Sequence, residues 1–144
     1  MRSDSLNNLL KLRQWRKEEI ETEISRLQCA IDDEERRLKT MESELTSSFE
    51  AFRNRQAEET LDPCALKTFH AYFSSMNTKL EQQKKAVLRK IAELEETKRL
   101  LIEAYKEKML VENLKGRLCL RETRENNRRE QKELDFIFTT RLKR

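Results

Sequence analysis

The sequence has 144 residues, of which 40% are charged and 36% hydrophobic, and its formal net charge is +4. One Gly and one Pro leave few places to interrupt a helix, and this apolar fraction is too small for a broad globular core. The single glycine, Gly116, excludes a Gly-rich phosphate loop, and no apolar run approaches the roughly 20 residues of a membrane span. The N-terminus also lacks the apolar core of a signal peptide, so we expect a cytosolic, helical protein.

We expect the first helix over about 5–59, because apolar residues recur there at alternating steps of four and three. Written as heptads, the apolar a positions are Leu10, Ile24, Ile31, Leu38, Leu45 and Phe52. The corresponding d positions are Leu6, Ile20, Leu27, Met41 and Ser48. Arg13, Lys17 and Glu34 are charged exceptions in the same seam. Because the apolar stripe is narrow, this helix needs a partner helix along its length.

A turn is expected at about 60–63, where Leu61, Asp62 and Pro63 separate two helical patterns. Asp62 can cap exposed amides at the start of the next helix. Pro63 suits the first helical position, because the amide hydrogen that it lacks has no intrahelical partner there. These residues predict the reversal of the chain.

The second helix is expected over about 64–142. Its apolar residues first continue the four-three spacing at Leu66, Phe69, Phe73, Met76, Leu80 and Val87. A second stripe follows at Ile91, Leu94, Leu101, Tyr105 and Met109. The change of register near Val87 predicts a stutter, which locally relaxes supercoiling. The two patterns together predict one all-α domain over residues 1–144, a long antiparallel coiled-coil hairpin.

The second helix is also expected to extend beyond the first. Antiparallel pairing places Leu6 opposite Leu118 and leaves roughly 26 residues, on the order of 40 Å of helix, without a partner. From Leu114 onward there are ten Lys and Arg against five Asp and Glu, whereas the rest of the chain has 21 against 22. The net positive charge therefore arises at this C-terminal overhang.

The overhang has a polar part and an apolar end. Its basic residues repeat at helical steps: Arg121, Arg124, Arg128, Arg129 and Lys132. Its apolar residues follow: Leu134, Phe136, Ile137, Phe138 and Leu142. A frayed, partly disordered terminus is one interpretation, and a surface that a partner covers is the other.

Five of the nine aromatic residues lie close to the turn: Phe49, Phe52, Phe69, Tyr72 and Phe73. Phe52, Phe69 and Phe73 fall in the seam, whereas Phe49 and Tyr72 fall beside it. The cluster is either a locally thick core or a core with two exposed rings that anchor a partner. Trp15, beside Leu12 at the other end of the first helix, allows the same two interpretations.

Reactive side chains form no recognisable site. Cys29, Cys64 and Cys119 have no metal-ligand spacing and are expected to be free thiols. His70 is the only histidine, so no second imidazole is available to share a metal ion or a proton with it. We therefore expect no enzyme activity, metal or cofactor.

The C-terminal segment carries a family resemblance. Residues 128–135 read RREQKELD and precede a basic tail, and residues 112–114 read ENL ahead of the polar run. Together with the hairpin, the capped turn and the longer second helix, this segment resembles FliJ and its relatives, the central-stalk proteins of flagellar and virulence type III secretion. The RREQK run favours the flagellar branch.

The resemblance implies a non-enzymatic stalk and regulator of a hexameric export ATPase. Such a protein promotes ring assembly and hydrolysis, links the ATPase to the cytoplasmic domain of the export gate membrane protein, and in some relatives escorts export chaperones. It would be a cytoplasmic monomer, peripheral to the export apparatus at the inner membrane. The implied ATPase-binding residues are Leu6, Leu9, Trp15, Arg121, Arg124, Arg128, Arg129, Lys132, Leu134 and Ile137. The implied export-gate-binding residues are Phe49, Phe69, Tyr72, Phe73 and Met76.

Two other functions compete with this one. A general coiled-coil scaffold or dimerisation protein has the same heptads, and only its mass in solution distinguishes it. Nucleic-acid binding through the basic run is weaker, because no aromatic residue is interleaved to stack on bases. Four acidic residues also interrupt this run: Glu122, Glu125, Glu130 and Glu133.

Overall fold

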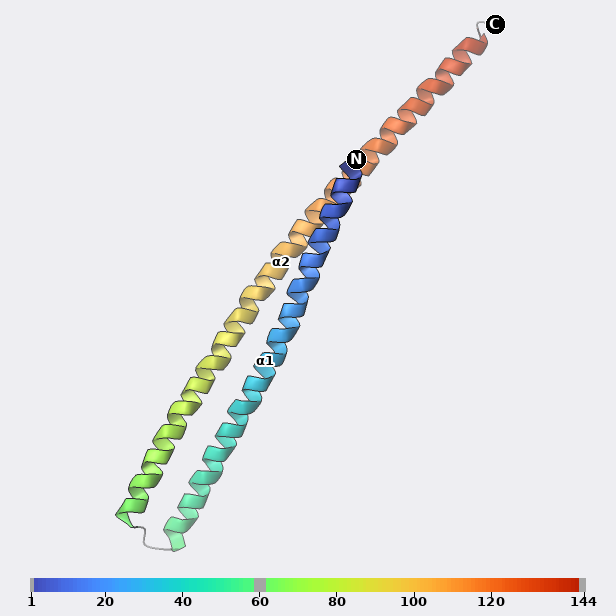
Figure 1. The fold of residues 1–144 in the computed structure, drawn as a ribbon. Helices are drawn as coiled ribbons and strands as arrows, with labels where there is room; N and C mark the ends of the chain where they lie inside the picture. Colours follow the sequence, from blue (N-terminus) through green and yellow to red (C-terminus); the bar gives the residue numbers. More distant parts are fainter. Residues whose placement is uncertain (1, 59–61, 143–144) are drawn as a thin grey trace. The chain divides into compact units, whose positions relative to one another are not determined.

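The computed structural model describes residues 2–58 and 62–142, which form two α-helices and no strand. Helix α1 is Arg2–Glu58 and helix α2 is Pro63–Leu142 (Figure 1). These helices confirm the all-α, two-helix fold. Helix α1 begins before the expected start near residue 5, and Leu61, at the centre of the expected turn, lies outside the described residues.

The start of α2 has the expected main-chain geometry. Pro63 is its first residue, and the carbonyl oxygen of Asp62 accepts a hydrogen bond from the Leu66 amide at 3.2 Å. Asp62 thus occupies the N-cap position, where the carbonyl already belongs to the helical ladder while the residue itself is outside the helix.

The chain divides into two compact units. Unit 2 is Glu21–Arg99 and contains the later part of α1 with the earlier part of α2. Unit 1 is Met1–Ile20 with Leu100–Arg144 and contains the start of α1 with the end of α2. Both units lie within the single domain that is expected from the sequence.

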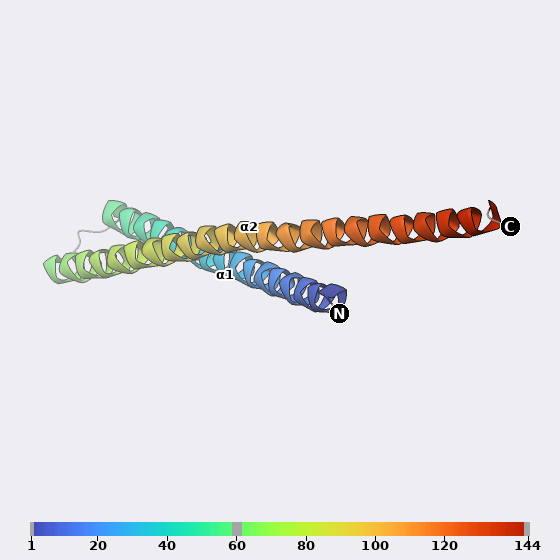
Figure 2. The ribbon, with the colours of Figure 1, turned by 90° about the horizontal axis from the view of Figure 1, so that it is seen from above.

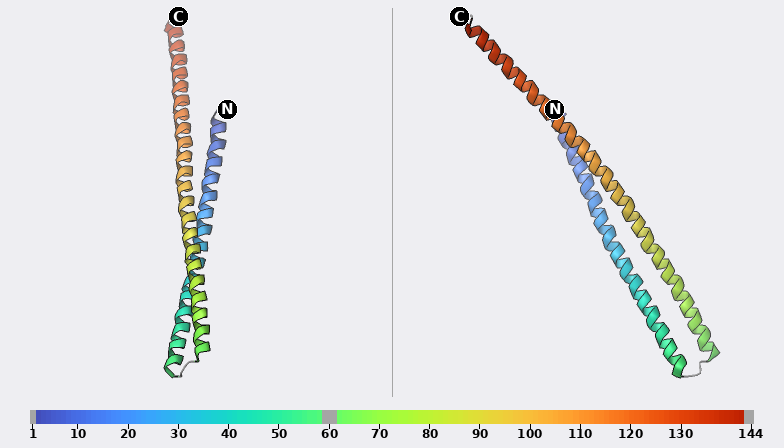
Figure 3. Two further views of the ribbon diagram at one scale, coloured as in Figure 1. Left: turned by 90° about the vertical axis from the view of Figure 1, so that its left-hand side faces the viewer. Right: turned by 180° about the vertical axis from the view of Figure 1, so that it is seen from behind.

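Unit 2 is an antiparallel pair of helical segments, which run side by side in the right view of Figure 3 and cross in the left view. Its core contains the buried Leu27, Ile31 and Leu94, with Leu27 only 2% exposed. Near the turn, the rings of Phe52 and Phe69 have centroids 4.3 Å apart. Residues later in α1 therefore contact residues earlier in α2, as the hairpin prediction requires.

A polar pair replaces apolar packing at one position of this seam. The Gln83 side-chain amide donates a hydrogen bond to the Glu34 carbonyl oxygen at 3.1 Å, and a second one to the Glu34 carboxylate. Both residues are partly buried. Glu34, an exception in the predicted heptads, thus has a partner across the seam that the apolar pattern of α2 did not include.

Unit 1 is also an antiparallel pair, and its described part buries mainly small side chains. Ala104 and Val111 of α2 are buried. The Arg13 guanidinium donates a hydrogen bond to the Glu107 carboxylate at 2.7 Å, and the Lys17 ammonium lies 5.6 Å from the centre of the Tyr105 ring. These contacts join the start of α1 to the region of α2 that follows residue 100.

Burial along α1 follows the predicted heptads from Leu6 to Phe52. Every predicted a and d residue is buried or half-buried, including the charged Arg13, Lys17 and Glu34. The prediction for this helix is confirmed because its apolar residues occupy almost all seam positions.

The prediction for α2 is partly wrong. Leu66, Tyr105 and Met109 were expected in the seam and are exposed. Buried and half-buried residues instead continue without a break in the four-three repeat: Phe69, Phe73, Met76, Leu80, Gln83, Val87, Lys90, Leu94, Thr97, Leu101, Ala104, Lys108, Val111, Lys115 and Leu118. The predicted stutter near Val87 is therefore wrong.

These differences have physical reasons. Helix α1 keeps one heptad register, so an unbroken register in α2 lets both seams face each other. Lysine can occupy such a seam because its aliphatic stem packs while the ammonium group reaches water. Leu66 is exposed because residues 53–58 of α1, which it would face, are themselves exposed and mostly polar. None of the described helices is both long and apolar enough to cross a membrane.

Candidate functional site

The C-terminal part of α2 is a helix without a neighbour. Leu118 is the last half-buried residue, and every described residue over 119–142 is exposed. Within unit 1, Figure 2 shows this orange-to-red part of α2 continuing beyond the start of α1. The segment is roughly 36 Å long at the helical rise. The expected overhang is therefore confirmed, and its side chains are free to contact a partner.

The basic residues of this segment form a stripe on one helix face. Its members are separated by steps of four, three, four and four residues, and such steps keep side chains on one side of a helix. The members are Arg117, Arg121, Arg124, Arg128 and Lys132. None of them forms an ion pair with another residue in the described part of the chain.

The acidic residues lie mainly on other faces. Glu122 and Glu133 are separated by eleven residues, or about three turns, and therefore share a face that differs from the basic stripe. Glu122 and Glu133 interrupt the basic run along the chain, whereas the helix face of Arg117, Arg121, Arg124 and Arg128 meets its first acidic residue at Asp135.

The apolar end of α2 is exposed as well. Leu134, Ile137, Phe138 and Leu142 lie at steps of three, one and four residues, which place them on one face. Phe136 points to another side. This apolar face does not continue the seam, because a further four-three repeat from Leu118 passes through polar residues such as Glu122 and Glu125.

The start of α1 adds three exposed apolar residues. Leu9, Leu12 and Trp15 are exposed, whereas Leu6 is half-buried in the seam. Of the two interpretations left open for Trp15, its 62% exposure favours a ring that is available to a partner. Among the residues that the family resemblance assigned to ATPase binding, Leu6 alone belongs to the helix–helix seam.

The aromatic cluster near the turn contains three half-buried rings and two exposed ones. Phe52, Phe69 and Phe73 are half-buried, as expected for seam residues. Phe49 is 52% exposed and Tyr72 is 42% exposed. Each of these two rings packs against Phe73, with centroids 5.7 and 5.6 Å away. Both rings therefore stabilise the cluster and still offer surface to a partner.

The two exposed rings line grooves on opposite flanks of the helix pair. Phe49 lines a groove of about 740 Å³ together with Phe73 and His70. Tyr72 lines a groove of about 530 Å³, and its hydroxyl lies 3.4 Å from that of Ser48. A partner that contacts both rings must therefore reach both flanks, and Met76 lines neither groove.

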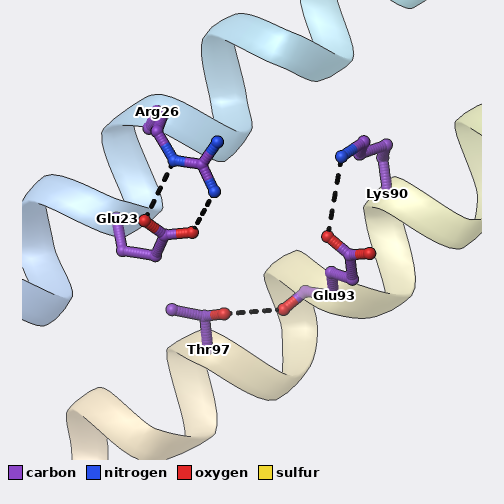
Figure 4. Close-up of polar contacts among 5 residues, drawn as sticks. All are labelled: Glu23, Arg26, Lys90, Glu93 and Thr97. Carbon is purple, nitrogen blue, oxygen red and sulfur yellow. Dashed lines mark hydrogen bonds and ion pairs between the residues drawn. The ribbon is translucent and has the colours of Figure 1, made fainter.

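Surface charges in the middle of unit 2 are paired locally. Arg26 donates to Glu23, with one hydrogen bond of 3.0 Å, and the Lys90 ammonium lies 3.8 Å from the Glu93 carboxylate. Figure 4 shows both pairs. The hydrogen bond from Arg26 lowers the pKa of Glu23, and the same bond raises the pKa of Arg26. Thr97 donates its hydroxyl to the Glu93 carbonyl oxygen at 2.8 Å. These local pairs contrast with the unpaired basic stripe of unit 1.

Metal and thiol chemistry are not indicated. No group of three or more His, Cys, Asp or Glu residues in the described ranges is arranged to hold a metal ion. Cys29, Cys64 and Cys119 are free and exposed.

Comparison with known proteins gives one match. The family model described as the flagellar FliJ protein matches residues 1–142. Searches of curated proteins and of solved structures find no match.

Proposed function

We propose a function on the premise that the chain belongs to the FliJ family of flagellar proteins. The family is a non-catalytic component of flagellar protein export, so the chain has a role in flagellar export and associates with the export apparatus. We infer more specifically that it is the stalk and regulator of the export ATPase. In this role it promotes assembly of the hexameric ring, stimulates ATP hydrolysis and links the ATPase to the export gate from the cytoplasmic side.

The exposed helix over 119–142 is the observation that carries this proposal. Unpaired cations can steer a helix into an acidic or polar ring, and a few exposed apolar residues can hold it there. The proposed contacts of the overhang are Arg121, Arg124, Arg128, Arg129, Lys132, Leu134 and Ile137. Leu9 and Trp15 add exposed contacts from α1, and Leu6 supports them from the seam.

The aromatic cluster is the proposed contact with the export gate. Phe49 and Tyr72 supply the exposed rings, both of which pack against the half-buried Phe73, and Phe69 and Met76 are half-buried. Exposed aromatic rings that rest on a packed cluster are typical anchors in protein interfaces, because little side-chain entropy is lost when they bind.

Steady-state ATP hydrolysis tests the ATPase role. The cognate export ATPase is assayed alone, with the full chain, and with a chain that ends at Leu118. Because residues 119–142 are exposed, the truncation removes none of the buried residues of unit 1. We expect the full chain to stimulate hydrolysis and the truncated chain to lose most of this effect.

Point variants of the full chain check that result. Leu134→Gln with Ile137→Gln is expected to lower stimulation about tenfold, the size typical of losing an interface anchor. Leu88→Gln is the matched control, because Leu88 is 64% exposed and lies in unit 2. Equal stimulation by the full and truncated chains would contradict the role of the overhang. Absence of stimulation and of co-elution, with both proteins folded, would favour a general scaffold.

Binding to the cytoplasmic domain of the gate protein tests the second contact. Phe49→Ala with Tyr72→Ala is expected to weaken binding about tenfold, since both rings lose their exposed surface. Leu88→Ala is again the control. Unchanged affinity of the double variant, with its helix content preserved, would remove the aromatic cluster from the gate interface. Co-elution with export chaperones is a separate assay for the escort role found among relatives.

A further inference from the structure

One flank of unit 1 combines exposed leucines with unpaired arginines. In the heptads of both helices, the c and g positions lie on one side of the a/d seam and the b and e positions on the other. In the four-three repeat of α2, Phe69 is at d and Phe73 at a, so Tyr72 is at g. The groove lined by Tyr72 also contains Glu44 and Ser47, which are at g and c of α1. The c and g positions of the two helices therefore share a flank in unit 2. Because the four-three burial repeat is unbroken, the same relation holds in unit 1.

The first part of this flank is apolar. Leu9 and Leu12 stand at g and c of α1, and Leu110 and Leu114 stand at c and g of α2. Leu12 and Leu110 are 60% and 63% exposed, and the other two are exposed as well. The ion pair between Arg13 and Glu107 joins the two helices beside these leucines. Four exposed leucines on one flank form an apolar patch of the kind found at binding sites.

The second part of the flank is basic and follows directly along α2. Arg117, Arg121, Arg124 and Arg128 occupy the next c, g, c and g positions after Leu114. All four are exposed, and none makes an ion pair with a residue in the described part of the chain. The surface from Leu110 to Arg128 extends over roughly 27 Å along the helix axis. We name the four leucines and four arginines together the c/g surface.

We propose that the c/g surface is a docking site for an acidic amphipathic helix of a partner protein. The partner helix would place apolar side chains on the leucine patch and, farther along, carboxylates opposite the arginines. A partner helix of five turns matches the length of the surface. A third helix that lies along the flank of a helix pair buries apolar side chains of both helices. This inference goes beyond the proposed ATPase and gate contacts, although it uses some of the same arginines.

Charge and apolar character exclude two other occupants. The four leucines and four arginines of a second copy include no carboxylate that could face the arginines of the first, and arginines brought opposite one another repel. Nucleic acid would satisfy the arginines, but phosphate groups give the leucine patch no partner. An acidic amphipathic helix is complementary to both parts of the surface.

A synthetic helix can test the proposal without the ATPase or the gate. The probes are two fluorescein-labelled peptides of about 21 residues, with Leu on one face of one half and Glu on the same face of the other half. The acidic half is C-terminal in one peptide and N-terminal in the other, so that both orientations are sampled. A peptide of each type with Lys in place of Glu is the charge control. Fluorescence anisotropy with the full chain gives the Kd.

Two pairs of substitutions separate the basic part from general electrostatics. Arg121→Glu with Arg124→Glu is expected to weaken binding of the acidic peptide at least tenfold. Lys11→Glu with Lys106→Glu changes the net charge of unit 1 equally at exposed positions outside the c/g surface. This control is expected to change the Kd less than twofold. Equal losses in both variants would show attraction by net charge alone and would overturn the proposal.

The apolar part has its own pair of variants. Leu110→Gln with Leu114→Gln is expected to weaken binding about tenfold, and Leu88→Gln is expected to leave it unchanged. Because these leucines are exposed, helix content by circular dichroism should be preserved in each variant. Absence of binding by both acidic peptides at about 100 µM, or equal binding of the Lys peptides, would overturn the proposal. A labelled single-stranded oligonucleotide is tested as well. If it binds more tightly than the acidic peptides, and binds the leucine variant as well as the unchanged protein, the c/g surface is a nucleic-acid site instead.

Discussion

Units 2 and 1 keep the same heptad register and bury different side chains. Unit 2 buries the large apolar residues Leu27, Ile31, Val87 and Leu94. The buried residues of unit 1 are Ala104 and Val111, and cations stand at other seam positions: Arg13, Lys17, Lys108 and Lys115. A heptad register therefore sets which positions face the partner helix, while the side chains at those positions set how strongly the helices are held.

The cations in the seam of unit 1 make its helix pair less stable than an apolar seam would. A buried methylene group contributes about 0.8 kcal/mol, so Ala and Val stabilise a helix pair less than Leu and Ile do. The Arg13 Nε atom is also buried without a hydrogen-bond partner in the described part of the chain. Few buried apolar contacts are typical of regions that open locally. We infer that the helix pair of unit 1 opens more readily than that of unit 2.

The largest expected effect is in the core of unit 2. Leu27→Ala should lower the free energy of unfolding by about 3 kcal/mol, because a fully buried leucine leaves a cavity when it is truncated. Leu88→Ala, at an exposed position of the same unit, should change it by no more than about 0.5 kcal/mol. Urea unfolding followed by circular dichroism measures both. Similar losses would show that burial in this seam does not determine stability.

A smaller effect of opposite sign is expected in unit 1. Lys108→Leu should stabilise the protein by about 1 kcal/mol, because an apolar side chain at this seam position buries more surface. The substitution also removes the 3.6 Å ion pair with Glu112, whose contribution is small because the Glu112 carboxylate is exposed to water. Amide hydrogen exchange over 100–118 should slow, and the exposed control Lys106→Leu should leave it unchanged. Faster exchange in Lys108→Leu would mean that the lysine stabilises the seam.

The smallest expected effect concerns the surface pair of unit 2. The hydrogen bond from Arg26 lowers the pKa of Glu23 below its ordinary value. A lowered pKa means that the carboxylate stabilises the fold above the unfolded pKa, and that this contribution disappears as the pH falls through the folded pKa. Glu23→Gln should therefore lower Tm by less than about 2 °C at pH 7, and by less still at pH 3. A larger decrease at pH 3 than at pH 7 would contradict this assignment.

The seam of α1 was predictable from sequence because its apolar residues occupy nearly every seam position. In α2 the apolar pattern and the burial pattern part after Leu101: Tyr105 and Met109 are exposed, while Lys108 and Lys115 are half-buried. The predicted stripe is confirmed at Ile91, Leu94 and Leu101, which are buried or half-buried, and it is wrong at Tyr105 and Met109. Continuing the register of Phe73, Met76 and Leu80 without a break would have found the correct face.

The candidate surfaces were predictable to different degrees. The positions of Phe49 and Tyr72 beside the seam allowed exposed rings or a thick core, and the structure shows both rings exposed. The basic face of α2 required helix geometry, because Glu122 and Glu133 are close to arginines in sequence and lie on another side of the helix. No signal in either helix alone identified the leucine patch, since Leu9 and Leu110 belong to different helices.

The sequence by itself determined the helices, the overhang and its positive charge, because these depend on local periodicity, on the scarcity of Gly and Pro, and on composition. Only the tertiary structure decided which lysines enter the seam of α2 and which exposed residues of two distant segments share a flank. Both outcomes depend on the register between helices, which arises from the summed packing of the whole seam. A single stripe of apolar residues carries too little information to specify that register.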